Sequence, residues 1–302
     1  MVPPCGGIQE VQTSDVFDLL LVKNTNYSNE IVGVFFSIAS ANKHCIFPMN
    51  AISLKQIFLI ALILTSIFSC SKKQVDKSLT LDAYLKLGVP DPAKVWDMND
   101  FSQAYGALGK IKWDRPYELP VKDSKKSGLL FEHMLSFENM SFLHNSKLTL
   151  NEKAEYITAF VRVNRYWMDV YSNPVIGNFY HRELIYIQIF NLGIMDNMVN
   201  LALEINKSND PTAVVLKQGV KSIKIDYLDC LTTDLKTQSH TSQFLKKDLD
   251  TMADTVYASV MRHKEWMDSS AVNDLKQSLH LVMDSTSSDH IRNKYTTLEK
   301  SL

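Results

Sequence analysis

The sequence predicts an all-α protein, a helical bundle of about six or seven helices with an irregular N-terminal part. Glycine and proline are scarce, with 10 and 9 residues in a chain of 302, whereas all-β chains need many turns and use both more often. From residue 127 onward, apolar residues recur every three or four positions, which is the period of one helix face. With 45% hydrophobic residues, the chain can bury one sizeable core or two small ones.

Residues 80–126 predict short helices separated by turns. Glycine and proline interrupt this segment at Gly88, Pro90, Pro92, Gly106, Gly109, Pro116 and Pro120. Asp91 followed by Pro92 predicts the start of a helix, because Asp is a preferred N-cap and Pro at the first helical position has no N–H to satisfy. Residues 112–126 predict an irregular loop.

Residues 127–302 predict the bundle itself. Apolar residues over 130–143 indicate a first helix, which also carries His133 and Glu138. Thr149 and Glu152 form a capping box at the start of the next helix, in which each side chain satisfies a backbone N–H of the other. Its core-facing stripe consists of Tyr156, Phe160, Val163, Trp167, Val170 and Tyr171. Residues 179–206 form the most apolar helix, so we expect it at the centre of the bundle.

The stretch 211–268 predicts an antiparallel helical hairpin. Apolar residues step by three and four in both halves, as in a coiled coil. The first seam is Ala213, Leu216, Val220, Ile223, Tyr227 and Cys230, and the second is Leu245, Leu249, Met252, Val256 and Val260. Two more helices follow, over 272–282 and 287–302. No fixed repeat period is present, which argues against a solenoid of helical repeats.

A short apolar segment that ends at Cys70 has the pattern of a signal peptide. Lys55 gives it a weakly positive start, and Ile57–Phe68 is an almost wholly apolar run of 12 residues. A membrane-spanning helix needs about 20 such residues, so this length is typical of the apolar region of a signal. The aliphatic Ile67 and the small Ser69 then precede the cysteine. The segment resembles the lipobox signal of bacterial lipoproteins.

This resemblance implies that the thiol of Cys70 is diacylated, that residues 49–69 are removed, and that the new N-terminus is acylated in turn. Two or more acyl chains hold a protein stably on a membrane, whereas one binds reversibly. Residues 1–48 would then be a spurious or disordered extension before a true start at Met49. The alternative is a genuine long N-terminus with an internal anchor. Residues 70–79 are polar and predict a tether that reaches roughly 15–20 Å.

The expected location is the cell envelope. Ser71, not Asp, follows Cys70, and within the lipoprotein resemblance this implies the outer membrane of a two-membrane bacterium. The expected partners are the lipid bilayer, reached through acylated Cys70, and an envelope protein. The formal net charge of −1 gives no basic footprint for nucleic acid.

The cysteines exclude a disulfide within the mature domain. Cys5 and Cys45 lie in the extension and Cys70 carries lipid, which leaves Cys230 alone. Its apolar neighbours at helical spacing indicate a buried, inert thiol.

No motif in the sequence assigns a catalytic residue, a cofactor or a metal. The Glu-x-x-His pattern of di-iron bundles, His-Glu-x-x-His, the P-loop, GxGxxG and G-x-S-x-G are absent. A speculative pocket consists of His181, Glu183, Gln188 and Asn191 on the 179–206 helix. His181 and Glu183 point to different sides of a helix, and the simpler interpretation is a solvated first turn favoured by the helix dipole. The amides of Gln188 and Asn191 predict either an internal polar network or a lined pocket.

Three functions remain open from the sequence. The first is a membrane-anchored, non-catalytic binding or structural module of the envelope. The second is an envelope enzyme whose active site is dispersed around the start of the 179–206 helix. The third is an oligomer built on the apolar seams of residues 211–268.

Overall fold

The computed structural model describes part of the chain, and the prediction of an all-α bundle is confirmed there. The described residues are 81–302 without 92–93, 95, 111–118, 125–132, 145–146, 174, 176–178, 210–212 and 241–242. Within them the structure contains helices and no strand. The extension, the signal segment, Cys70 and the tether lie outside the described residues, as does most of the predicted loop 112–126.

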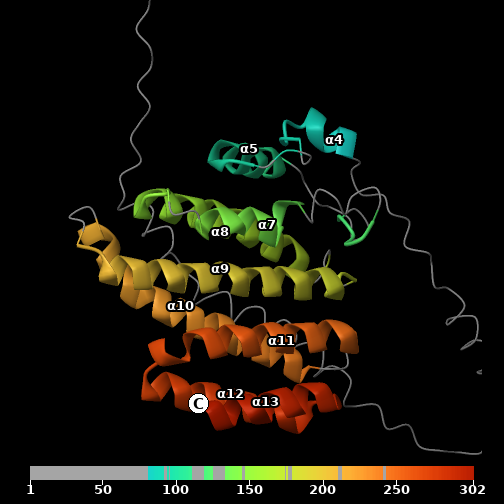
Figure 1. Ribbon diagram of the computed structural model, residues 1–302. Coiled ribbons are helices and arrows are strands. Elements are labelled where there is room, and N and C mark those ends of the chain that lie inside the picture. Colours follow the sequence, from blue (N-terminus) through green and yellow to red (C-terminus); the bar gives the residue numbers. More distant parts are fainter. Residues whose placement is uncertain are drawn as a thin grey trace, which may run out of the picture.

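The helices form successive layers that follow the order of the chain (Figure 1). Their bounds are α4 Leu81–Lys86, α5 Met98–Leu108, α7 Phe137–Met140, α8 Leu150–Ser172, α9 His181–Lys207, α10 Ala213–Ser239, α11 Lys246–His263, α12 Ser269–Ser285 and α13 Asp289–Ser301. Short 3₁₀ turns extend α7 over Ser141–His144 and α11 over Lys264–Trp266. Helix α5 packs on α8, α8 on α9, and α9 on both α10 and α11, while α12 and α13 complete the far layer.

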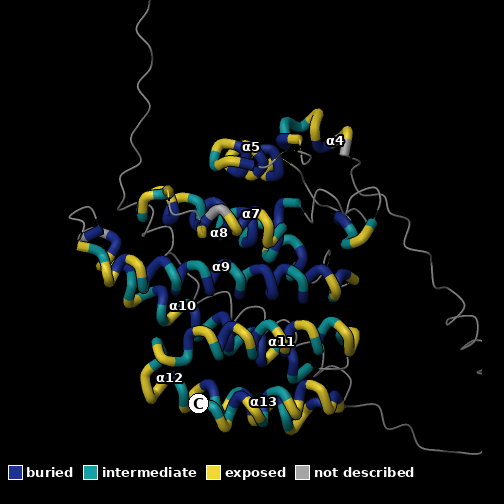
Figure 2. Tube along the Cα trace, viewed as in Figure 1, coloured by how far each residue is buried: buried dark blue, intermediate teal, exposed yellow. Residues whose placement is uncertain are grey.

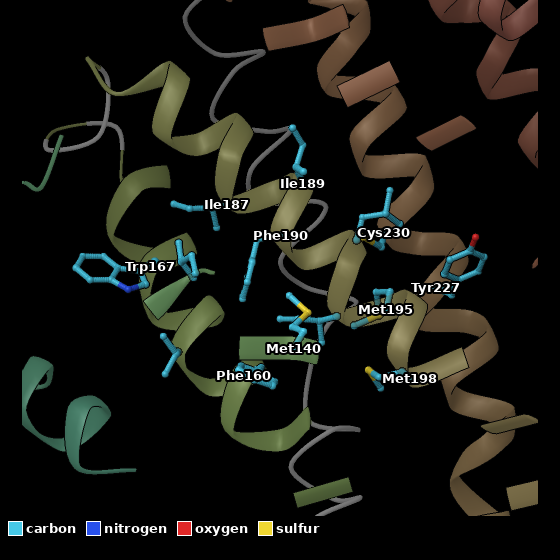
Figure 3. Packing of buried hydrophobic residues seen from close by; sticks show 14 of the residues in the cluster. Met140, Phe160, Trp167, Ile187, Ile189, Phe190, Met195, Met198, Tyr227 and Cys230 are labelled. Carbon is cyan, nitrogen blue, oxygen red and sulfur yellow. The ribbon is translucent and has the colours of Figure 1, made fainter. Parts of the chain in front are cut away.

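Helix α9 lies at the centre of the bundle, as its apolar sequence predicts. It contacts α8 on one side and α10 and α11 on the other, and buried positions run along its length (Figure 2). Figure 3 shows Phe190 pointing from α9 toward the side of Phe160, a residue of α8 whose ring centroid lies 6.5 Å away. Phe160 in turn meets Phe101 of α5 at 4.8 Å. Edge-to-face aromatic contacts of this kind add to the hydrophobic stabilisation of the core and here join three layers.

The capping box at the start of α8 is confirmed. The backbone N–H of Glu152 donates to Oγ1 of Thr149 at 3.2 Å, and the N–H of Thr149 donates to Oε2 of Glu152 at 2.7 Å. The predicted stripe of α8 also faces the core: Phe160, Val163, Trp167 and Tyr171 are buried, and Tyr156 and Val170 pack against them.

The helix predicted to start at Asp91 and Pro92 does not continue through the described residues that follow, since Lys94 and Trp96 are not helical; Pro92 itself lies outside the described residues. Helix α5 begins at Met98, because Asp97 and Asp100 form a reciprocal capping box there, with N–H to carboxylate distances of 2.9 and 3.0 Å. The carbonyl of Asp91 instead accepts a hydrogen bond from Nε1 of Trp96 at 3.0 Å. Asp91 therefore belongs to the turn that leads into this helix.

The single helix predicted over 130–143 is also interrupted. Ser136 has an extended backbone with φ −80° and ψ 128°, and its hydroxyl accepts from the N–H of Glu138 at 3.2 Å. A serine whose hydroxyl accepts from a backbone N–H two residues further along the chain acts as an N-cap and starts a new helix. His133 and Glu138 consequently lie on two different short helical pieces.

The two seams of residues 211–268 are not a self-contained hairpin. Helix α10 packs mainly on α9 and α12, and α11 packs mainly on α9 and α13. The seam residues are buried or packed against the common core, except Leu245, which is the N-cap of α11 and is exposed. None of the described helices is both long and apolar enough to cross a membrane.

Candidate functional site

Glu183, in the first turn of α9, is buried, so the prediction of a solvated turn is wrong for this residue. This side chain is 5% exposed and accepts a hydrogen bond from the backbone N–H of Lys122 at 2.8 Å. The loop over residues 119–124 folds across the turn, and its Pro120 carbonyl accepts from the Tyr171 hydroxyl. Burial raises the pKa of the Glu183 carboxyl, although the hydrogen bond from Lys122 opposes the rise.

The neighbours of Glu183 on α9 face other parts of the structure. The ring of His181 packs edge-on against Phe244, with centroids 5.5 Å apart. Arg182 forms an ion pair with Asp123 at 2.6 Å and approaches Asp248 to 3.9 Å. His181 and Glu183 therefore have different surroundings, as expected for residues two positions apart on a helix.

Gln188 and Asn191 belong to an internal polar network. Nε2 of Gln188 donates to Oγ1 of Thr237 at 3.1 Å. The amide of Asn191 accepts from Nδ2 of Asn164 at 3.0 Å and donates to Sγ of Cys230 at 3.3 Å. These contacts join α8, α9 and α10 through their buried faces. Burial also raises the pKa of the Cys230 thiol well above its ordinary value, which disfavours the reactive thiolate.

The structure does not bring the four residues of the speculative pocket together. At 1.5 Å per residue, His181 and Asn191 are separated by about 15 Å along the axis of α9. Each pocket residue also has partners of its own, on the 119–124 loop, in the 240–245 connection or on α10.

A cluster that the sequence analysis missed lies between α9, α10 and α11. The hydroxyl of Tyr227 donates to Oγ of Ser259 at 2.8 Å, and Ser259 donates to Oδ1 of Asp196 at 2.5 Å. Nη1 of Arg262 donates to the second oxygen of Asp196 at 2.5 Å. Nε2 of His263 lies 3.3 Å from Oδ1 of Asp196. A charged residue buried in the most apolar helix needs such partners. The presence of Asp196 in that helix was therefore the sequence signal from which this cluster could have been expected.

The cluster contains the residue types of a serine nucleophile site, but its hydrogen bonds differ from those of such a site. In a catalytic triad, histidine accepts the serine proton and the carboxylate orients the histidine. Here the Ser259 hydroxyl donates to Asp196 directly, and Ser259 and His263 are both buried. Burial also raises the pKa of Tyr227. The arrangement joins three helices and does not activate the serine.

Asp234 is a second buried acid on α10. It is 2% exposed, and burial raises its pKa well above the ordinary value, so the neutral, protonated form is favoured. Cys230 and Gln238 flank it at positions four residues away, and Oε1 of Gln238 accepts from the Tyr295 hydroxyl of α13 at 2.6 Å. Oδ2 of Asp234, Oε1 of Gln188 and Nε2 of Gln238 have no hydrogen-bond partner among the described residues.

No group of three or more histidine, cysteine or acidic side chains that could hold a metal ion occurs within the described part of the chain. Comparison with known proteins gives no matching family model, no matching curated protein and no matching solved structure.

Proposed function

We propose that this protein is a lipid-anchored protein of the bacterial cell envelope, with a helical domain that serves as a non-catalytic binding or structural module. The observation that carries the proposal is the segment Ile57–Cys70. Its apolar run, Ile57–Phe68, has the length of a signal, and Ser69 and Cys70 follow it directly.

The geometry of the domain is consistent with a non-catalytic role. Two of its buried ionisable groups have partners inside the fold: Asp196 is paired with Arg262, and Cys230 accepts a hydrogen bond from Asn191. Efficient nucleophiles and general bases instead need solvent or substrate access and a pKa near the working pH.

One observation favours the alternative of an enzyme centred on the start of α9. The buried carboxyl of Glu183 has a raised pKa, which is the property of a general acid. If Glu183 serves as a general acid, Glu183→Gln should abolish the catalytic activity of the enzyme while the folded helical structure is retained.

The alternative of an oligomer built on the seams of residues 211–268 loses the surface on which it depended. The residues of both seams, apart from Leu245, contribute to the core of a single chain. An oligomer would need another surface.

The intact mass of the protein, purified from the membrane fraction of a bacterial host, tests the lipid anchor. We expect a mass that equals residues 70–302 plus acyl chains, and the loss of this mass in Cys70→Ala. Cys230→Ala is the matched control, because its thiol is buried, and it should keep the acylated mass. A full-length mass without lipid would refute the proposal.

Density fractionation of the membranes tests the location. We expect the acylated protein in the outer-membrane fraction of a two-membrane host, and a shift of Ser71→Asp toward the inner membrane. A protein that occupies the inner membrane irrespective of residue 71 would refute the outer-membrane assignment but not the anchor.

A further inference from the structure

One end of the domain carries a group of exposed apolar side chains. Val175 is 71% exposed, Leu245 is 65% exposed and Phe179 is 55% exposed. Single exposed apolar residues are ordinary on protein surfaces, whereas a local group of them marks a contact surface. We call the residues Val175, Phe179, Leu245, Lys246 and Lys247 the apolar end.

Two side-chain contacts bring the segments of the apolar end together. His181, at the start of α9, packs against Phe244, next to Leu245. Arg182 approaches Asp248 in the first turn of α11 to 3.9 Å. Val175 and Phe179 lie in the connection that leads into α9. The apolar end is therefore formed where α8 ends and where α9 and α11 begin.

Helix α4 lies at the same end, and it is the first described element after the tether. Tyr84 of α4 is close enough to affect the titration of Tyr171 in the last turn of α8, together with Tyr180 and Glu183. Figure 1 shows α4 on the side of the bundle where α9 begins. A fully extended chain from Cys70 to α4 reaches at most about 40 Å, and a coil reaches about half of that. A lipid on Cys70 therefore keeps this end near the bilayer.

The charges at the apolar end suit a lipid surface. Lys246 and Lys247 are exposed, and basic residues close to an anionic membrane are attracted to its headgroups. The acidic side chains Asp123 and Asp248 both face Arg182, which partly neutralises them. Exposed apolar side chains beside lysines are the composition of interfacial membrane contacts.

We infer that the apolar end docks on the lipid surface, with Val175, Phe179 and Leu245 in the interfacial region and Lys246 and Lys247 against anionic headgroups. This inference rests on the proposed lipid anchor, and it adds an orientation: the starts of α9 and α11 face the membrane.

The test uses the acylated protein, reconstituted into vesicles of phosphatidylethanolamine and phosphatidylglycerol. A polarity-sensitive fluorophore is attached to Leu245→Cys, to Phe179→Cys and to the control Ile225→Cys. Ile225 is 52% exposed and lies near the middle of α10, away from the apolar end. The protein without an introduced cysteine controls for labelling of the buried Cys230. Quenchers attached to the lipid acyl chains then report the contact.

We expect lipid quenching at positions 245 and 179 to exceed that at position 225 by at least about twofold, because only the first two enter the interface. Equal quenching at the three positions, or none at any, would overturn the inference. Exclusion of an aqueous quencher in native membranes but not in pure lipid vesicles would also overturn it, because the partner would then be a protein. Intact mass is measured first on each sample, so loss of acylation, which refutes the anchor, is distinguished from an acylated protein that fails to dock.

Discussion

Replacing Asp234 by asparagine should remove a pH-dependent loss of stability. Its carboxyl is buried, and burial raises its pKa well above the ordinary value of 3.8. At a pH between 3.8 and the raised pKa of the folded state, the carboxyl of residue 234 has lost its proton in the unfolded chain but retains it in the folded chain. The folded state then binds more protons than the unfolded state, so the free energy of unfolding falls as the pH rises.

The size of the effect follows from the single proton involved. One proton changes the free energy of unfolding by about 1.4 kcal/mol per pH unit within this window. Asparagine has nearly the same shape and does not ionise. As the pH rises, we therefore expect the free energy of unfolding of Asp234→Asn to increase relative to that of the wild type by the same slope, until the raised pKa is reached. Urea unfolding, followed by circular dichroism over the weakly acidic to neutral range, measures it.

The control for this experiment is Asp289→Asn, since the Asp289 side chain is 90% exposed. It should follow the wild-type curve. If Asp234→Asn also stays parallel to the wild type, the argument from burial is refuted. A wild-type advantage that grows with pH would mean that Asp234 is ionised and paired in the folded protein.

Three further substitutions test the packing and the polar contacts by the same unfolding measurement. Ser259→Ala should lower the free energy of unfolding by about 1–3 kcal/mol, because Oδ1 of the buried Asp196 loses its hydroxyl donor and the buried Tyr227 hydroxyl loses its acceptor; an unchanged stability would contradict the importance of these contacts. Thr149→Ala should cost about 1 kcal/mol through the lost helix cap, and a cost near zero would mean that the cap is redundant. Gly193→Ala should destabilise by about 1–3 kcal/mol, because its new Cβ would meet the Phe137 ring at 2.6 Å. In a Phe137→Ala background the same change should stabilise by about 0.5–1 kcal/mol through helix propensity, and destabilisation there would refute the steric explanation.

Much of the helical architecture could be predicted from the sequence because it depends on local patterns. The capping box at Thr149 involves residues three positions apart, and the stripe through Phe160 and Trp167 repeats at helical spacing. The central place of α9 followed from its apolar circumference. The interruptions were harder to predict: the Ser136 cap competes with a continuous apolar pattern, and the capping pair Asp97 and Asp100 lies close to the competing signal at Asp91.

The polar interior could not be predicted to the same extent, because its partners are far apart in the chain. Asp196 and Ser259 are separated by 63 residues, and Lys122 and Glu183 by 61. No local spacing relates such pairs. Gln188 was recognised as a group that needs a partner, but the identity of that partner depends on the register between α9 and α10.

The layered order of the helices affects how the chain reaches its fold. Most helices contact the next helix, or the one after it, along the chain. The contact order is therefore low, and proteins dominated by local contacts fold faster than those with distant pairings. A chain that emerges N-terminus first can add each helix to a layer that already exists. The outermost helices, which pack on one side only, are also the regions where we expect sub-global unfolding to begin, and hydrogen exchange would detect it there first.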